Sequence, residues 1–277
     1  MKGEKYDNYF NSYKKIMGAF LEISTSIPCI LHCEYCPQEV LKKKYKSKIK
    51  NLSLNNFKIA INKLPENSVI TWSAFNEPFQ NPETIDMIFY AYEKGHKIQL
   101  NTTLVGLNIE KYNLIKDLPF SLFGIHLPDS EGKTVIPITI QYKTLLKYIV
   151  ENPPLNVNYN HHAAEVHDEI KNIINSSHKL IIHNRSGLIK GGRVDYHPNV
   201  IKCGQQFLFT NNDGGCVLLP NGDCVTCCQS FNIQERLGNL FTQSWGEIKS
   251  NIKLFELCKF CRYAVDKDES AISQLGG

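Results

Sequence analysis

The side chains best suited to chemistry in this chain of 277 residues are its 10 cysteines. Three of them, Cys29, Cys33 and Cys36, lie within eight residues in a C-x3-C-x2-C pattern. The other seven all lie in the last third of the sequence: Cys203, Cys216, Cys224, Cys227, Cys228, Cys258 and Cys261. The N-terminal residues are too polar for a secretory signal, so we expect a cytoplasmic protein without a disulfide framework. Metal binding or redox chemistry is therefore the first interpretation.

The first three cysteines have the number and spacing of ligands for a metal cluster. Three thiolates on one loop can hold three corners of a [4Fe–4S] cluster and leave one iron open to a substrate or cofactor. A structural zinc site needs a fourth ligand, which His32 could supply. The triplet directly follows an expected strand, at the end where parallel α/β folds bind ligands. This position favours a catalytic cluster, with zinc as the alternative.

The C-terminal cysteines can supply a second metal site. Cys258 and Cys261 form a C-x2-C pair, and two thiolates at this spacing can reach one metal. Cys203 and Cys227 bring the candidate ligands to four, which suits a second iron–sulfur cluster or a zinc ribbon. The cysteines left over are Cys216, Cys224 and Cys228. Their simplest interpretation is as buried or alternative-ligand thiols.

Composition narrows the class of protein. A hydrophobic fraction of 42% is typical of a globular protein, and no apolar run reaches the roughly 20 residues that span a bilayer. The net charge of +4, from 31 basic and 27 acidic residues, is too even to predict nucleic acid as a partner. Residues 41–50 hold six lysines; we interpret them as a solvated helix face, with attraction of an anionic substrate as the alternative.

Strand and helix patterns alternate through the cysteine-free stretch that separates the two groups. Strands are expected at residues 20–24, 69–72, 97–100, 122–126, 157–160 and 179–183. Helices are expected at residues 82–94, 108–118, 139–150 and 164–175. The first helix has end signals, with Asn81 as N-cap, Pro82 in the first turn and Gly95 after the last turn. This alternation predicts a parallel α/β fold.

Cys29–Cys36, with the sequence Cys-Ile-Leu-His-Cys-Glu-Tyr-Cys, resembles the signature of radical S-adenosylmethionine (radical SAM) enzymes. Ser73–Pro78 follows the second expected strand, where that family carries a Gly-Gly-Glu-Pro-like segment, and Asn101–Thr103 resembles its next strand end. The chain departs from the family in having Phe75-Asn76 in place of Gly-Gly. The resemblance implies a partial (β/α)6 TIM-type barrel over residues 1–198.

The resemblance also implies site residues in this core. Cys29, Cys33 and Cys36 would hold a [4Fe–4S] cluster that binds SAM. The residues implied to contact SAM are Tyr35 near the adenine, Ala74, Phe75, Asn76 and Glu77 at the methionine amine, and Asn101, Thr103 and His126 at the ribose or carboxylate. Core packing is the alternative for Tyr35 and Phe75, and a hydrogen-bonded core or rim histidine for His126.

Residues 199–277 resemble the family's auxiliary-cluster module, called SPASM or, when shortened, twitch. The resemblance implies a second [4Fe–4S] cluster on Cys203, Cys227, Cys258 and Cys261, with Pro220–Asp223 as the turn before the second ligand. It also suggests that one of the leftover thiols donates a hydrogen atom to a substrate radical: Cys216, Cys224 or Cys228. Arg185 is the best candidate to hold a substrate carboxylate or phosphate, with a surface ion pair as the alternative.

The implied reaction is hydrogen abstraction by a 5′-deoxyadenosyl radical. An external one-electron donor such as flavodoxin or ferredoxin would reduce the cluster, and the outcome would be dehydrogenation or epimerisation of a small molecule or carbohydrate. Maturation of a ribosomal peptide is the alternative; we expect it less because only 28 residues precede Cys29. A glycyl-radical activase usually has further cysteines soon after the triplet. A zinc-binding interaction protein is the non-enzyme alternative.

Overall fold

The computed structural model describes residues 18–182, 184–189, 196–203 and 214–267. Its strands are β1 (Phe20–Ile23), β2 (Val69–Trp72), β3 (Lys97–Thr102), β4 (Leu122–His126), β5 (Val157–His161), β6 (His178–Lys179), β7 (Val200–Cys203), β8 (Gly215–Leu218), β9 (Asp223–Val225), β10 (Arg236–Asn239) and β11 (Ala264–Asp266). Its helices are α2 (Gln38–Lys44), α3 (Leu54–Ile61), α4 (Thr84–Glu93), α5 (Ile109–Ile115), α6 (Ile140–Glu151) and α7 (Trp245–Ser250), with short 3-10 helices η1 (Pro78–Gln80) and η2 (Glu256–Phe260).

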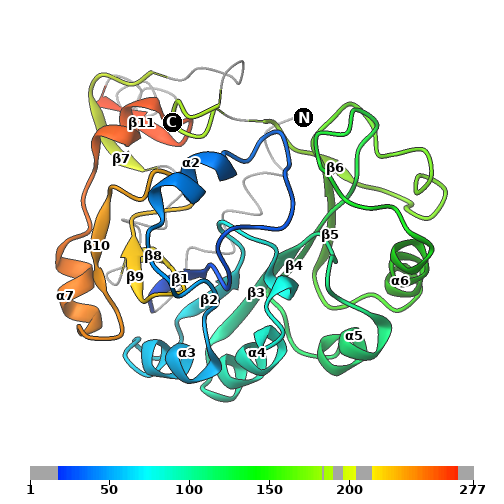
Figure 1. Ribbon diagram of the computed structural model, residues 1–277, viewed down its shortest axis with the longest axis horizontal. Coiled ribbons are helices and arrows are strands. Elements are labelled where there is room, and N and C mark those ends of the chain that lie inside the picture. The colour runs from blue at the N-terminus through cyan, green and yellow to red at the C-terminus, as the bar shows by residue number, and fades with distance from the viewer. Residues whose placement is uncertain (1–17, 183, 190–195, 204–213, 268–277) are drawn as a thin grey trace, which may run out of the picture.

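A nine-stranded sheet organises the molecule, in the order β10-β9-β8-β1-β2-β3-β4-β5-β6. Strands β1 to β6 are parallel and follow one another in chain order, and β8 joins the other side of β1, also in parallel. The hairpin of β8 and β9 and then β10 continue the sheet in antiparallel pairing. The curved, open arc in Figure 1 confirms the predicted α/β fold with a partial TIM-type barrel.

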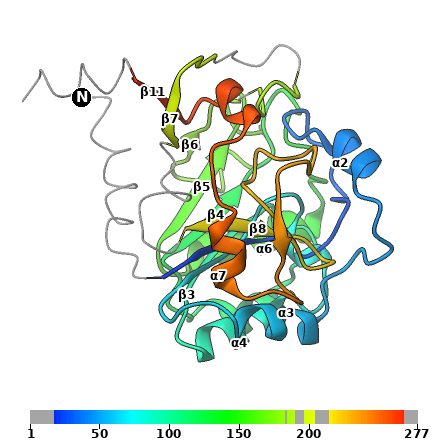
Figure 2. The same ribbon diagram turned by 90° about the vertical axis from the view of Figure 1, so that its left-hand side faces the viewer.

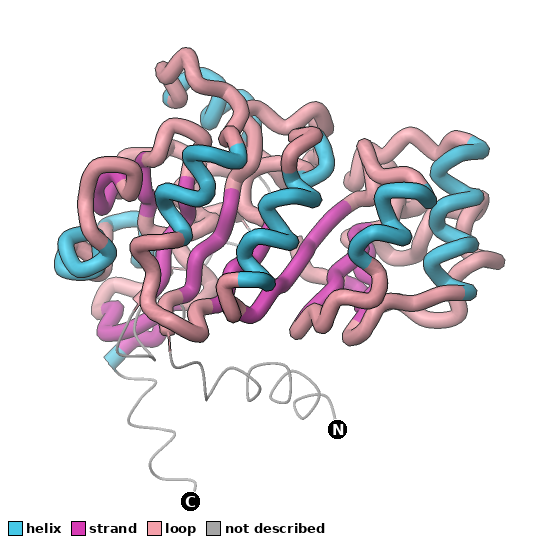
Figure 3. Tube along the Cα trace, turned by 90° about the horizontal axis from the view of Figure 1, so that it is seen from below, coloured by secondary structure: helices cyan, strands magenta, loops and turns pink. Residues whose placement is uncertain are grey.

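Helices cover the outside of the arc, and the strands lie inside it (Figure 3). Strand β2 is buried along its whole length, as expected for a parallel strand covered on both faces. Helices α3, α5 and α6 begin at Ser53, Asn108 and Thr139, whose side chains accept hydrogen bonds from backbone amides of the first turn. None of the helices in the described residues has the length and apolar character needed to cross a bilayer.

One predicted helix is wrong. Residues 164–175 form turns, because the backbone of this segment pairs with the loop that follows β4. Val166 forms an isolated antiparallel bridge with Asp129, and the His167 amide donates to the Pro128 carbonyl at 3.0 Å. These tertiary contacts use backbone groups that a helix would need for its own hydrogen bonds. The connection from β5 to β6 therefore has no helix.

Two further boundaries differ from prediction. Asn81 does not cap α4, which begins three residues later at Thr84. Its amide instead donates to the carbonyls of Thr25 and Leu52, at 3.0 and 2.8 Å, and so ties two loops together. The strand predicted at residues 179–183 is reduced to β6, and residue 183 lies outside the described residues.

The C-terminal segment, residues 226–267, lies on the side of the barrel that carries β8 (Figure 2). Lys63, just after α3, donates to three carbonyls of this segment, those of Leu240, Phe241 and Gln243, at 2.8 to 2.9 Å. Strands β7 and β11 form a separate two-stranded antiparallel sheet. The domain boundary between residues 198 and 199 stays a prediction.

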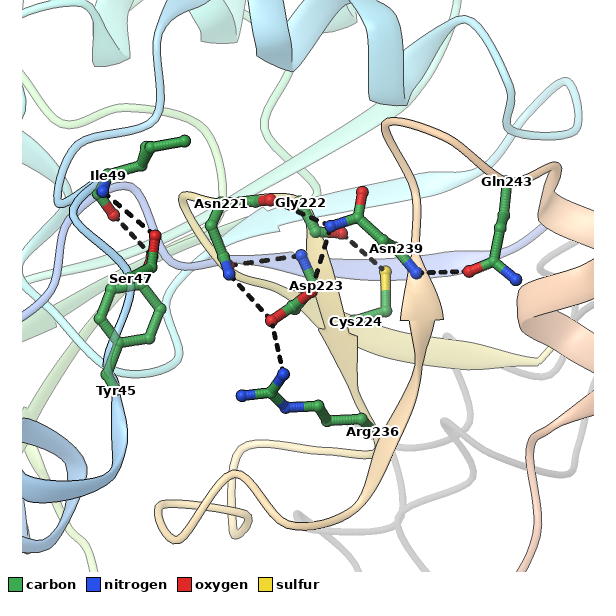
Figure 4. A network of polar contacts seen from close by, with 10 residues as sticks. All are labelled: Tyr45, Ser47, Ile49, Asn221, Gly222, Asp223, Cys224, Arg236, Asn239 and Gln243. Atoms are coloured by element: carbon green, nitrogen blue, oxygen red, sulfur yellow. Dashed lines mark hydrogen bonds and ion pairs between the residues drawn. The ribbon is translucent and has the colours of Figure 1, made fainter.

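The predicted Pro220–Asp223 turn joins β8 to β9. Gly222 has a φ of +86°, and a Cβ there would lie 2.5 Å from the Phe241 ring, so this position suits glycine. Asn239 on β10 donates to the Asn221 carbonyl at 3.0 Å and to the Asp223 carboxylate at 3.1 Å (Figure 4). The turn is thus fixed by side chains from the neighbouring strand.

Candidate active site

A cavity of about 320 Å³ lies at the carboxyl ends of the parallel strands. It collects the triplet after β1, the Ser73–Glu77 segment after β2, and residues at the ends of β3 and β4. The predicted site residues that line it are Cys29, Cys33, Tyr35, Cys36, Ala74, Phe75, Asn76, Glu77, Asn101, Thr103, His126 and Arg185. Parallel α/β folds bind ligands at this edge of the sheet, so we take the cavity as the candidate active site.

Gln38, the first residue of α2, holds the triplet in place. Its Nε2 donates to Cys36 Sγ at 3.2 Å and to the Phe75 carbonyl at 2.7 Å, and its Oε1 accepts from the Cys29 amide at 3.2 Å. The Leu31 amide also points at Cys29 Sγ, at 3.4 Å. Donors aimed at sulfur stabilise a thiolate and tune a cluster that the thiolates bind.

The three thiols share a poorly solvated environment. Burial raises the pKa of Cys29 to about 12 and raises the pKa values of Cys33 and Cys36 as well. They are therefore protonated at neutral pH, and a bound metal would have to displace the protons. Within the described ranges, no three His, Cys, Asp or Glu side chains converge in the way that a single ion requires. The thiols instead line the wall of one cavity, which fits a cluster of several irons.

Glu77 fixes the turn between β2 and η1 against the end of β3. Its buried carboxylate accepts hydrogen bonds from Thr102 Oγ1, the Thr103 amide and Thr103 Oγ1, each at 2.6 Å, and from the Phe79 amide at 3.2 Å. Burial raises the pKa of Glu77, and these hydrogen bonds act in the opposite direction. The hydroxyl of Thr103 is occupied by this carboxylate, so Thr103 positions Glu77.

The backbone before Glu77 bends sharply at Ala74. Ala74 adopts a φ of +64°, a left-handed conformation that is uncommon for residues with a side chain. The Phe75 ring is fully buried against Phe231, with ring centres 4.7 Å apart, so it packs in the core. Asn76 donates to Thr25 Oγ1 at 2.8 Å and holds the segment to the loop after β1.

Aromatic rings form a row along another wall. Tyr35 lies against His162, with ring centres 3.8 Å apart, and His162 stacks on His126 at 5.6 Å with nearly parallel planes. Burial, and to a lesser extent the charge of Arg185, lowers the pKa of His126 to about 4. Its ring is therefore neutral at neutral pH. Such a row presents flat ring surfaces of the kind that contact a nucleobase.

Asn101 reaches the cavity because the neighbouring strand carries no side chain beside it. A Cβ on Gly124 of β4 would lie 2.3 Å from Asn101 Oδ1. Glycine at this position therefore leaves room for the Asn101 amide.

No protein-family model matches this sequence, and no curated protein does. Among solved structures, BtrN in complex with AdoMet and 2-DOIA aligns with a TM-score of 0.59 and 15% identity, over 83% of this chain and 81% of that one. Polyhistidine-tagged anSMEcpe with bound AdoMet aligns with a TM-score of 0.57 and 13% identity, over 88% and 83%. Streptococcus suis SuiB bound to precursor peptide SuiA aligns with a TM-score of 0.57 and 14% identity, over 93% and 73%. All three are radical SAM enzymes. The chain has the radical SAM fold.

Beside the cavity of this radical SAM fold, Arg185 and Glu22 form a polar group. Arg185 Nε donates to the Tyr35 carbonyl at 3.2 Å. Glu22 on β1 accepts from Ser73 Oγ at 3.1 Å, and the thiol of Cys228 lies near enough to its carboxyl to affect the pKa of Glu22. Burial raises the pKa of Glu22 to about 6, against the lowering effects of Ser73, Cys228 and Arg185. A substrate here would meet a cation and a titratable carboxyl together.

The three leftover cysteines lie in two different environments. Cys216 on β8 and Cys224 on β9 are both buried in the main core. Cys228 packs with Cys36 and Ala74 against a smaller apolar cluster on the cavity side. Of the three candidates for hydrogen-atom donation, Cys228 is thus the one beside the site.

The predicted auxiliary ligands are gathered in part. Cys227 lies within electrostatic range of Cys203 and Cys261, and burial raises its pKa well above the ordinary value. Cys203 on β7 pairs with Ala264, three residues beyond Cys261. Cys258 begins the turn that leads to Cys261, whose amide donates to the Cys258 carbonyl at 3.2 Å. Four cysteine thiols have the chemistry that a cluster or a zinc ion needs, and the auxiliary metal site stays a prediction.

Sequence reasoning missed Gln38 and Glu22. The sequence signal for Gln38 was a polar residue directly after the triplet loop. In the structure its side chain is only 2% exposed and so faces the protein interior. Glu22 is an acidic residue within the apolar β1 sequence Phe-Leu-Glu-Ile, and a charge at that position indicates a polar barrel interior.

Proposed function

We propose that this chain is a radical SAM enzyme with a [4Fe–4S] cluster on Cys29, Cys33 and Cys36. When bound, the reduced cluster supplies the electron that cleaves SAM to a 5′-deoxyadenosyl radical. The observation that carries the proposal is the single cavity shared by the three thiols, the Glu77 turn and the aromatic row. The radical SAM fold supports it independently of the motif.

The chain's own residues would have distinct tasks. Backbone groups of residues 74–76 would hold the methionine amine, and Glu77 keeps that turn rigid against β3. The Tyr35, His162 and His126 rings would border the adenine.

A small molecule or carbohydrate is the substrate class we propose. The cavity of about 320 Å³ is at the small end of the range for ligand pockets, and SAM must share it. Arg185 can hold a carboxylate or phosphate of such a substrate bidentately. BtrN, which carries 2-DOIA beside AdoMet, adopts the same fold. SuiB, bound to a precursor peptide, makes a peptide substrate the second candidate.

The reaction outcome depends on what happens to the substrate radical. If Cys228 gives the substrate radical a hydrogen atom, the product is an epimer. If the radical instead loses an electron, the product is oxidised. That electron could pass to an auxiliary [4Fe–4S] cluster on Cys203, Cys227, Cys258 and Cys261. Cys228 packs against the apolar cluster that contains Phe75, and its thiol lies near the Glu22 carboxyl. We propose one of these two outcomes.

Iron and acid-labile sulfide per chain, after anaerobic reconstitution, test the metal content. With two clusters, wild type holds about eight irons and the Cys29/Cys33/Cys36→Ala variant about four. The matched control is Cys216→Ala, which removes a buried thiol outside the cavity and should hold as much iron as wild type. Zinc in place of iron would refute the proposal. Candidate sugars and peptides are then compared by substrate-dependent 5′-deoxyadenosine, which separates the two substrate classes.

A further inference from the structure

A strongly basic surface adjoins the triplet. We call residues 42–50 the basic segment; it contains Lys42, Lys43, Lys44, Lys46, Lys48 and Lys50 and no acidic residue. All of these lysines but Lys42 are exposed. Their six charges exceed the net charge of +4 of the whole chain, so the rest of the chain is slightly acidic. The net positive charge of this protein therefore comes from this one segment.

Both ends of the basic segment are fastened beside the triplet. At its start, α2 begins with Gln38, which is bonded to Cys36 Sγ and to the Cys29 amide. At its end, the Ile27 amide donates to the Lys50 carbonyl at 2.9 Å. The backbone that carries the lysines is thus anchored on both sides next to the triplet loop. In Figure 2, α2 projects at the right-hand edge of the molecule, where a partner can reach it.

The basic segment is also internally ordered. Tyr45 is 3% exposed, and its hydroxyl donates to the Ile49 carbonyl at 2.6 Å, while the Ile49 amide donates to Ser47 Oγ at 3.1 Å (Figure 4). Lys50 Nζ lies 4.7 Å from the centre of the Tyr45 ring. A preorganised loop costs little ordering entropy when a partner binds.

Most of this charge is available to a partner. Lys42 pairs with Glu39 at 2.7 Å, whereas Lys43, Lys44 and Lys46 form no ion pair with the part of the chain that the structure describes. Two apolar side chains are also exposed: Ile49 within the basic segment is 45% exposed, and Ile30 inside the triplet loop is 51% exposed. Exposed cations around a few apolar contacts are suited to a transient protein interface.

We propose that the basic segment docks an acidic one-electron carrier protein. This inference rests on the proposed function, because the reaction needs one electron for each SAM cleaved. The oxidised carrier leaves, and the cluster on the triplet gains the electron. Electron tunnelling weakens steeply with distance, so a carrier must dock near Cys29 to Cys36. Positive charge beside that loop steers an acidic carrier to it. A nucleic acid is disfavoured, because Tyr45, the aromatic residue of the segment, is buried and cannot stack on bases.

The test is a charge reversal, Lys43/Lys46/Lys48→Glu, matched by a control with the same change of charge elsewhere, Lys94/Lys97/Lys147→Glu. All six lysines are exposed. The probe is a flavodoxin, titrated into the reconstituted enzyme at low and high salt. We expect the reversal to weaken binding at least ~10-fold and to abolish its salt dependence, and the control to bind as wild type does. Equal weakening in both variants, or no weakening in the reversal, would overturn the inference.

A second measurement separates this inference from the proposed function. With dithionite, a small chemical reductant, the reversal variant should produce 5′-deoxyadenosine at the wild-type rate, whereas with flavodoxin its rate should fall in parallel with binding. Loss of the dithionite reaction in the reversal variant alone would mean damage to the site and would overturn the docking role. If wild type fails with dithionite, the proposed function fails, and the flavodoxin titration still decides the docking surface. Tighter binding of single-stranded nucleic acid than of flavodoxin would also overturn it.

Discussion

Replacing Glu77 with glutamine tests how the turn after β2 is held. The substitution keeps the size and shape of the side chain. It replaces one of the two accepting carboxylate oxygens with an NH2 group, which can only donate hydrogen bonds. One oxygen accepts from the Thr103 amide and hydroxyl, and the other from the Thr102 hydroxyl and the Phe79 amide. Whichever way the glutamine amide turns, its NH2 group faces one backbone N–H and one hydroxyl.

The hydroxyl can rotate away, but the backbone N–H cannot, so each orientation leaves one buried donor unsatisfied. An unsatisfied buried donor costs ~1–3 kcal/mol, and a hydrogen bond to a charged acceptor contributes ~1.5–3 kcal/mol. Removing the buried charge offsets part of this loss, because burial raises the pKa of Glu77 and so disfavours its ionised form. We expect Glu77→Gln to lower the free energy of unfolding by about 2 kcal/mol.

The assay is anaerobic urea unfolding of the reconstituted enzyme, read as the midpoint at fixed pH, together with the KM for SAM. The control is Glu83→Gln. Glu83 accepts one backbone hydrogen bond, from the Leu54 amide at 3.2 Å, and a glutamine oxygen can replace it. Glu77→Gln should lower the midpoint and raise the KM, and Glu83→Gln should do neither. Equal midpoints in the two variants would show that the hydrogen bonds of the Glu77 carboxylate do not stabilise this turn.

Three further changes test other parts of the site. Because the pKa of Glu22 is raised from 4.5 to about 6, ionisation of Glu22 destabilises the fold as the pH rises through that range. Glu22→Gln should therefore reduce the fall of the urea midpoint between those pH values. A pH profile of the midpoint equal to that of wild type would contradict this prediction. Gly124→Ala should displace the Asn101 amide and weaken SAM binding several-fold with unchanged iron content, measured by equilibrium dialysis; unaltered affinity would show that Asn101 is not a contact. Cys228→Ser should change the product, or its uptake of deuterium from heavy water, whereas Cys216→Ser should leave both as in wild type.

Local sequence patterns were sufficient for most of the barrel. The apolar runs at β2 and β4 were predicted with the bounds that the structure has, and Asn108 and Thr139 begin their helices as N-caps. Local preferences and capping residues predict these elements correctly because no distant segment takes the backbone hydrogen bonds of these strands and helices. The triplet and the segment around Glu77 also meet at one cavity, as parallel strands require.

Contacts between distant segments decided the rest. The apolar spacing of residues 164–175 suits a helix, but the backbone around Val166 pairs with Asp129 instead. Asn81 has the chemistry of an N-cap, yet its amide is used by Thr25 and Leu52. Pairings of this kind depend on where loops meet in space, and no local pattern encodes that.

Reductive cleavage of SAM at the cysteine triplet is the reaction that we propose for this chain. The most direct measurement is 5′-deoxyadenosine released by the anaerobically reconstituted enzyme with SAM and dithionite. We expect release by wild type and by Cys216→Ala, and none by Cys29/Cys33/Cys36→Ala. Absence of 5′-deoxyadenosine from wild type that holds its full complement of iron, or equal release from the triple variant, would contradict the proposed function.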